Sequence, residues 1–258
     1  MGAIERTVTV NGIEVHCEER GDPAGEPLLL LHGFFGTGAD WRLVFDLDAL
    51  ARGRRVIVPD ARGHGRTDNP SGEFTIRRCA LDALALLDAL GVGRFQAVGV
   101  SLGAKTLLHV ATQAPGRVGA MVLASAAPYF PAGARPLMRA AAEAEHGEAE
   151  WAAMRARHVR GDAQVRALWR VAGSLAEGHD DMNFTPPLLA TVAAPTLLVS
   201  GDRDPFYPVE LAVELYRAIP RASLWVVPGE GHAPVFGAAR EAFAATAEAF
   251  LRGHAAAA

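Results

Sequence analysis

The feature that most constrains the fold is an alternation of short apolar runs with longer amphipathic stretches. The apolar runs have the length and continuity of strands buried on both faces, and they lie at 28–31, 55–58, 95–100, 120–124, 195–200 and 224–227. Elsewhere apolar residues recur every three or four positions, which predicts helices at 75–90, 102–114, 209–218 and about 234–251. Strands that alternate with helices predict βαβ units, and so an α/β fold with a mostly parallel sheet flanked by helices.

Two segments depart from this alternation. Asn11-Gly12 separates strand-like runs at 8–10 and 13–15, which predicts a hairpin because both turn positions favour positive φ. The stretch from about 128 to 187 has no strand-like run and is too long for a single crossover helix. We therefore predict a first core part at 1–127, a helical cap insertion at 128–187 and a second core part at 188–258.

Composition excludes several classes of partner. The 258 residues are 50% hydrophobic and 21% charged with a net charge of −4, which is typical of a globular protein and not of a disordered one. Without a basic stripe we expect no nucleic acid partner, and without a long apolar run or a signal-peptide pattern we expect no membrane partner. Cys17 and Cys79 are far apart and no metal-binding motif occurs, so we expect a cytoplasmic protein without disulfides, metal or cofactor.

The clearest candidate for a catalytic motif is the segment Gly99-Val100-Ser101-Leu102-Gly103. This G-x-S-x-G pattern follows a predicted strand and opens a predicted helix, a setting that exposes the serine hydroxyl on a tight turn at the end of the sheet. The backbone N–H of Leu102 then lies at the start of a helix, where N–H groups lack intrahelical partners and favour an anion. The pattern and its setting together indicate that Ser101 is a nucleophile.

A serine nucleophile needs a base, and the base needs an acid that orients it. His232 follows the last predicted strand and Asp204 follows the strand before it, so both lie at the carboxyl ends of strands. Open α/β sheets place their functional sites at these ends. The chain order serine, aspartate, histidine is the order expected if Ser101 is the nucleophile. Asp202 lies closer to the strand end and competes with Asp204 for the role of the acid.

Several segments together resemble the α/β-hydrolase superfamily, in an order that covers nearly the whole chain. They are 32–36 (HGFFG), 60–67 (DARGHGRT), 99–103 (GVSLG), 201–204 (GDRD) and 231–232 (GH). The resemblance implies Ser101 as nucleophile, His232 as base and Asp204 as acid. It also implies an oxyanion hole formed by the backbone N–H groups of Phe34 and Leu102.

The identity of the nucleophile narrows the reaction that the resemblance implies. Relatives that dehalogenate alkanes or open epoxides have a carboxylate at the position of Ser101. Epoxide hydrolases also have two lid tyrosines, whereas the insertion of this chain has Tyr129 alone. A serine suits acyl transfer through an acyl-enzyme. The resemblance therefore implies a capped serine hydrolase, similar to carboxylesterases and lactonases, that cleaves a small, apolar ester or lactone.

The same triad is compatible with other functions. It could serve hydrolysis of C–C bonds or another tailoring reaction, or belong to a small-molecule receptor with slow turnover. Candidate pocket residues favour an apolar small-molecule substrate, although they could also be core residues, and they are Phe34, Phe35, Tyr129, Trp151, Met154 and Phe206.

Other polar residues have expected structural roles. We expect His32 to shape the oxyanion loop through its hydrogen bonds and Lys105 to be a surface or capping charge. We expect His146, His158 and His179 to be surface residues of the insertion, because single histidines without a partner carry little functional signal.

Overall fold

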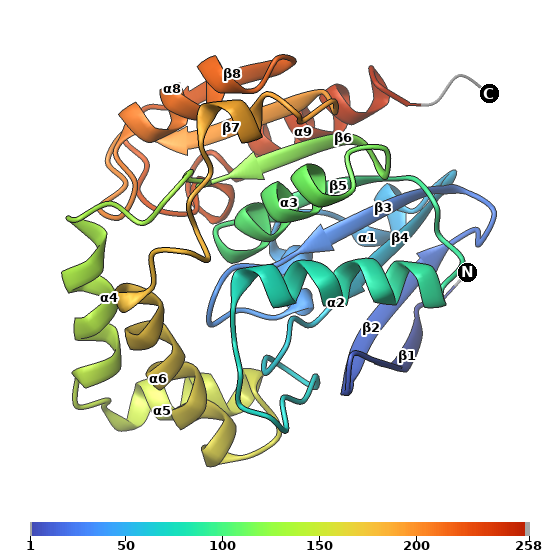
Figure 1. The fold of residues 1–258 in the computed structure, drawn as a ribbon. Helices are drawn as coiled ribbons and strands as arrows, with labels where there is room; N and C mark the ends of the chain where they lie inside the picture. The colour runs from blue at the N-terminus through green and yellow to red at the C-terminus, as the bar shows by residue number, and fades with distance from the viewer. Residues whose placement is uncertain (1, 256–258) are drawn as a thin grey trace.

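An eight-stranded sheet runs through the centre of residues 2–255, which are the residues that the computed structural model describes (Figure 1). The strands are β1 (Ile4–Val10), β2 (Ile13–Gly21), β3 (Glu26–Leu31), β4 (Arg54–Pro59), β5 (Phe95–Val100), β6 (Val118–Ala124), β7 (Thr196–Gly201) and β8 (Ala222–Val227). Their order in space is β1-β2-β4-β3-β5-β6-β7-β8. The pairs from β4 to β8 are all parallel, so the predicted α/β class is confirmed and these six strands end at one edge of the sheet.

The N-terminal hairpin forms where its turn residues predict it. Asn11 and Gly12 both have positive φ, at 49° and 76°, and the register pairs Val10 with Ile13. Both strands extend beyond the predicted runs, and β2 pairs with β4 in antiparallel fashion. The strand pattern in the sequence begins only at Val8, because the first residues of β1 are exposed and mostly polar.

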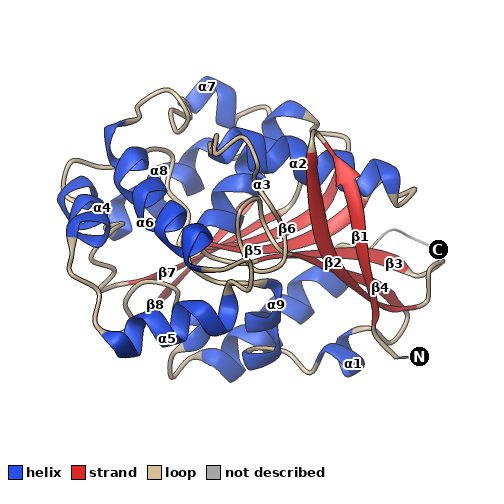
Figure 2. Cartoon of the chain, turned by 90° about the horizontal axis from the view of Figure 1, so that it is seen from below, coloured by secondary structure: helices blue, strands red, loops and turns tan. Residues whose placement is uncertain are grey.

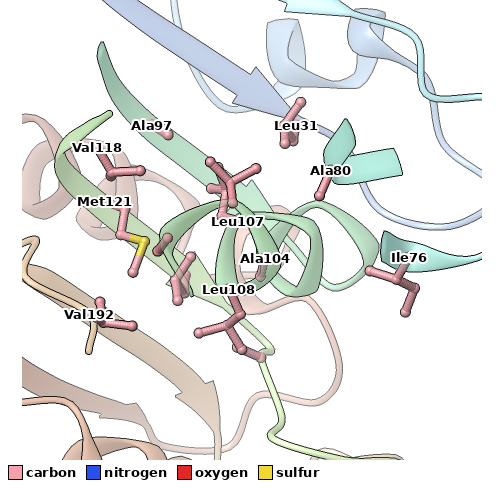
Figure 3. Packing of buried hydrophobic residues seen from close by; sticks show 14 of the residues in the cluster. Leu31, Ile76, Ala80, Ala97, Ala104, Leu107, Leu108, Val118, Met121 and Val192 are labelled. Atoms are coloured by element: carbon pink, nitrogen blue, oxygen red, sulfur yellow. The ribbon is translucent and has the colours of Figure 1, made fainter. Parts of the chain in front are cut away.

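Helices cover both faces of the sheet, as Figure 2 shows. Helices α2 (Ile76–Ala89), α3 (Leu102–Gln113) and α8 (Val209–Ala218) pack on one face, and α1 (Leu47–Leu50) and α9 (Arg240–Arg252) pack on the other. The consecutive leucines of β3 explain why its run has no polar position, because Leu29 and Leu31 face the first layer and Leu28 and Leu30 the second. Figure 3 shows Leu107 of α3 among Leu31, Ala97 and other buried side chains of the first layer.

Three helices between β6 and β7 form a separate layer, which we call the cap helices. They are α4 (Ala134–Glu143), α5 (Glu148–Arg157) and α6 (Asp162–Glu177), and they lie beside the end of the sheet toward which β3 and β6 point (Figure 1). They occupy the segment in which the sequence predicts an insertion. The short helix α7 (Pro186–Leu189) crosses the boundary predicted at 187.

Short elements account for the differences from the predicted helices. A 3-10 turn at Pro234–Phe236 is separated from α9 by residues 237–239, so the helix expected from about 234 begins at Arg240. A Cβ at Gly237 would lie 2.1 Å from the Glu230 carboxylate, so a larger residue at this position would require the end of that side chain to move. The 3-10 helix Gly38–Leu43 and α1 were missed because neither is long enough to show a periodicity. In the described part of the chain, no helix has the length and apolarity needed to cross a bilayer.

Candidate active site

Ser101 lies on a strained turn between β5 and α3. Its backbone has φ 50° and ψ −104°, a conformation that non-glycine residues rarely adopt and that is typical of functional turns. The two flanking glycines allow the close approach that this turn requires. A Cβ at Gly99 would lie 2.6 Å from the Gly103 backbone, and a Cβ at Gly103 would lie 2.1 Å from the carbonyl oxygen of Leu31. Both glycines of the G-x-S-x-G pattern are therefore required because a side chain at either position would clash with neighbouring backbone.

Three side chains from distant parts of the chain form one hydrogen-bonded row at this turn. His232 Nε2 lies 2.9 Å from Ser101 Oγ, and His232 Nδ1 lies 2.7 Å from Asp204 Oδ2. Because the carboxylate can only accept, His232 Nδ1–H donates to it and Nε2 accepts from the hydroxyl. Asp204 Oδ1 accepts the N–H groups of Phe206 and Tyr207 at 2.8 and 3.0 Å. The acid is therefore oriented by its own loop and in turn orients the ring.

Of the two candidate aspartates, the structure brings Asp204 to His232. Asp202 instead accepts the N–H of Gly229 at 2.6 Å, and so joins its loop to the one that carries the histidine. That second loop has another anchor, because the N–H of Ala233 donates to Ser125 Oγ at 2.9 Å. Ser125 shows no sequence signal for this role, because its positive φ of 52° at the end of β6 is visible only in the structure.

The loop after β3 lies beside Ser101 and is held by His32. The Nε2 atom of His32 accepts the N–H of Ala61 at 2.9 Å, so its Nδ1–H donates to the Gly33 carbonyl at 2.8 Å. A Cβ on Gly33 would lie 3.7 Å from that of Ser101, which shows how close the loop and the turn are. Within residues 2–255 the structure records no hydrogen-bond acceptor for the N–H groups of Phe34 and Leu102. These two donors are therefore available to an oxyanion.

A cavity of about 380 Å³ lies between the cap helices and the turn that carries Ser101. His232 and Ser101 line it together with apolar side chains that include Phe34, Phe35 and Phe206, three of the predicted pocket residues. The cap helices contribute Met138, Ala141, Arg157, Ala172 and Leu175. Such a lining favours a small apolar ligand with few polar groups.

The structure places the other three predicted pocket residues outside the lining of this cavity. Tyr129 is partly exposed and its hydroxyl donates to Glu214 at 3.1 Å. Trp151 and Met154 pack with Trp169 in a cluster that joins α5 to α6. Their apolar side chains serve packing between the cap helices and against Phe34 and Phe35. The helical periodicity of one segment does not distinguish such packing residues from pocket residues.

Lys105 corrects an expectation of the sequence analysis, because it is buried and lines the cavity. Every residue from Leu102 to Ala111 of α3 is buried, so this part of the helix has no exposed face on which a charge could lie. Its Nζ donates to the Tyr207 hydroxyl at 2.6 Å. Burial disfavours the charged amine and lowers the pKa of Lys105 to about 7.

His158 is a second correction, since it is buried between the cap helices and the core rather than exposed. Its Nδ1 accepts the N–H of Gly65 at 3.0 Å, and its Nε2 lies 3.2 Å from the Phe35 carbonyl, to which it donates. Burial lowers the pKa of His158 to about 4. His146 is also largely covered, because its ring stacks on Trp169, whereas His179 is exposed as expected.

Comparison with known proteins relates this geometry to a family. Residues 28–246 match the sequence profile of the Alpha/beta hydrolase family. The chain is 27% identical over 236 residues to the sn-1-specific diacylglycerol lipase ABHD11 of Xenopus laevis, a match that covers 82% of this chain and 75% of that protein. It is 38% identical over 128 residues to the 2-hydroxy-6-oxo-2,4-heptadienoate hydrolase of Pseudomonas putida, covering 48% of this chain and 45% of that one.

The solved structures include a neighbour of nearly the same length. A thermophilic esterase from Thermogutta terrifontis matches with a TM-score of 0.76 and 25% identity, over 99% of this chain and 100% of that chain. The match therefore includes the segment of the cap helices as well as the sheet.

Proposed function

The chain belongs to the alpha/beta hydrolase family and is a hydrolase, and from this premise we propose that it cleaves a small, largely apolar carboxylic ester or lactone. Ser101 is the nucleophile, His232 the base and Asp204 the acid. The observation that carries the proposal is the continuous hydrogen-bonded row from Asp204 through His232 to Ser101, which borders a cavity. The esterase and the lipase among the similar proteins support ester chemistry.

The geometry supports an acyl-enzyme mechanism. His232 takes the proton of the Ser101 hydroxyl as Oγ attacks the substrate carbonyl. The oxygen of the tetrahedral intermediate accepts hydrogen bonds from the N–H groups of Phe34 and Leu102. The proton on His232 Nε2 then goes to the leaving alkoxide as the bond to it breaks. A water molecule, activated by the same ring, attacks the acyl group and releases the carboxylic acid.

The position of the cap helices beside the cavity supports selection of substrates by size. Their side chains line part of the cavity, and its volume of about 380 Å³ suits a small molecule. The two cysteines are free and buried, which is typical of proteins from reducing compartments, and on this ground we propose a cytoplasmic enzyme.

C–C bond cleavage on the same triad is a second candidate. The identity to the 2-hydroxy-6-oxo-2,4-heptadienoate hydrolase favours it, although that match covers less than half of either chain. A receptor with slow turnover is the third. Both alternatives use the same nucleophile, so they differ from the main proposal in substrate and in the number of turnovers.

Steady-state kinetics on a panel of p-nitrophenyl esters and lactones tests the proposal, with Ser101→Ala as control. We expect many turnovers per enzyme molecule with at least one short-chain ester. The variant should lose about 10³-fold or more of kcat while its Tm stays within a few degrees of the wild type. A single turnover would favour the receptor. Equal rates in both proteins would refute the role of Ser101.

A further inference from the structure

Lys105 lies one helical turn after Ser101. Residues four apart share a face of a helix, and helical side chains point back toward the N-terminus. The side chain of Lys105 is therefore directed toward the turn of the nucleophile, and both residues line the same cavity. The row from Asp204 to Ser101 does not use the amine.

Among residues 2–255, no carboxylate forms an ion pair with this lysine. Another cation that lines the cavity, Arg157, lies 3.7 Å from the carboxylate of Asp40. For Lys105, in contrast, the described residues place no carboxylate oxygen within 4.0 Å of Nζ, whose recorded hydrogen-bond partner is the hydroxyl of Tyr207. Aromatic rings surround the amine, with the ring centres of Phe130 and Tyr207 at 4.7 and 5.0 Å.

This environment leaves the amine short of acceptors. An ammonium group has three N–H donors, and Tyr207 accepts one of them. Asp204 and Asp181 act on the amine only through longer-range attraction, which is weaker than the effect of burial that lowers its pKa to about 7. A carboxylate in the cavity would accept the remaining N–H donors and restore the charge balance, and such charge-assisted hydrogen bonds are among the stronger ones in proteins.

We propose that Lys105, oriented by Tyr207, binds a carboxylate group of the substrate, so that the preferred substrates are esters that also carry a free carboxylate. This inference rests on the proposed function, because it assigns the substrate class to the same cavity. The apolar lining then contacts the carbon chain between the carboxylate and the ester. Lys105 determines specificity and takes no part in the proton transfers at Ser101.

A purely structural role for Lys105 makes a different prediction. Tyr207 lies against His232, with ring centres 5.3 Å apart, and its backbone N–H donates to Asp204. If Lys105 only supported this loop, its loss would slow the hydrolysis of charged and neutral esters equally. The ratio of the two rates therefore separates recognition from support.

The kinetic test compares matched pairs of esters at pH 6.5. One pair is mono-p-nitrophenyl adipate and p-nitrophenyl hexanoate, with the carboxylate on the acyl side. The other is 4-hexanoyloxybenzoate and phenyl hexanoate, with the carboxylate on the leaving group. We expect kcat/KM to favour the charged ester by about 10-fold or more in one pair. Lys105→Met should reduce that ratio by about 10- to 100-fold, and Tyr207→Phe should reduce it by less. A preference for the neutral ester in both pairs, or a ratio unchanged by Lys105→Met, would overturn the proposal.

A second test observes the amine directly. Lys105 is the only lysine in the sequence, so protein labelled with ¹³Cε-lysine has a single lysine side-chain signal. We expect adipate to raise the titration midpoint of this signal by one pH unit or more, also in Ser101→Ala, whereas hexanol should not. An unchanged midpoint at saturating adipate would contradict recognition of a carboxylate.

The two tests keep the two proposals separate. Neutral esters that are hydrolysed through Ser101 without any preference for a carboxylate would leave the proposed function standing and remove this inference. An adipate-dependent midpoint in a protein that hydrolyses no ester would remove the proposed function and, with it, the assignment of ester substrates, and would leave only the binding of a carboxylate by Lys105.

Discussion

Replacing Lys105 by methionine should stabilise the folded protein, and by an amount that depends on pH. Methionine has a similar length and no charge, so it can fill the same space among the rings of Phe130 and Tyr207. The effect arises because an unpaired buried cation costs free energy that an apolar side chain does not.

The magnitude follows from the pKa of the buried amine. Burial lowers the pKa of Lys105 from 10.5 to about 7, while Asp204 and Asp181 oppose this only in part. At about 1.4 kcal/mol per pKa unit, the charged amine destabilises the folded state by roughly 5 kcal/mol below pH 7. Methionine leaves the Tyr207 hydroxyl without its partner, which costs about 1–3 kcal/mol. We therefore expect Lys105→Met to raise the free energy of unfolding at pH 6 by about 2–4 kcal/mol.

The sign of the pH dependence is also determined. The unfolded chain, with its amine at the usual pKa of 10.5, binds one more proton than the folded protein between about pH 7 and pH 10.5. The stability of the wild type therefore rises with pH over that range, relative to a variant without the amine. The advantage of Lys105→Met should shrink by roughly 3 kcal/mol between pH 6 and pH 9.

Urea unfolding of wild type and variant at several pH values measures this difference. Arg170→Met, at an exposed position of α6, is the control. It should change the stability by less than about 0.5 kcal/mol, with a difference from the wild type that is independent of pH. If the difference in free energy of unfolding between wild type and Lys105→Met stayed constant from pH 6 to pH 9, the pKa of Lys105 would not be lowered in the folded protein.

Three further predictions concern the turn, the acid and the cap. Gly103→Ala places a Cβ 2.1 Å from a carbonyl oxygen of β3, so urea unfolding should show a loss of about 3 kcal/mol or more, and near wild-type stability would contradict the steric argument. Asp204→Asn should lower kcat about 10⁴-fold by favouring the wrong tautomer of His232, and an equal loss in Asp202→Asn would refute the assignment of the acid. Burial holds the pKa of His158 at about 4 against 6.5, so the unfolded chain binds the extra proton between these values. This group alone should lower stability by roughly 3 kcal/mol as the pH drops through that interval. In thermal denaturation at several pH values, His158→Gln should therefore show a shallower fall than the wild type, and an equal fall would contradict the burial of this ring.

The parallel part of the sheet was predictable from the sequence because its strands are short runs of mostly apolar residues. β5 and β7 are buried along their whole length, so their runs of apolar residues differ clearly from helical patterns. The turn at Ser101 was also visible, since its two glycines are required by contacts with the strand and helix on either side. The structure brings His232 and Asp204 to this turn because both follow parallel strands that end at the same edge.

The contacts that the sequence did not reveal join residues far apart in the chain. The hydroxyl that partners Lys105 lies 102 residues away, and the N–H that His158 accepts lies 93 residues away. The pattern of α3 could not show that its first turns are buried on all sides. For this reason the sequence predicts an exposed lysine on this helix, whereas the structure shows that Lys105 is buried.

The central claim is that Ser101 is an activated nucleophile. Labelling of the purified protein with a fluorophosphonate, with mass spectrometry to locate the adduct and Ser101→Ala as control, tests it most directly. We expect one adduct per chain, on Ser101, and none in the variant. A folded wild-type protein that remains unlabelled, or that is labelled at another residue, would contradict the claim.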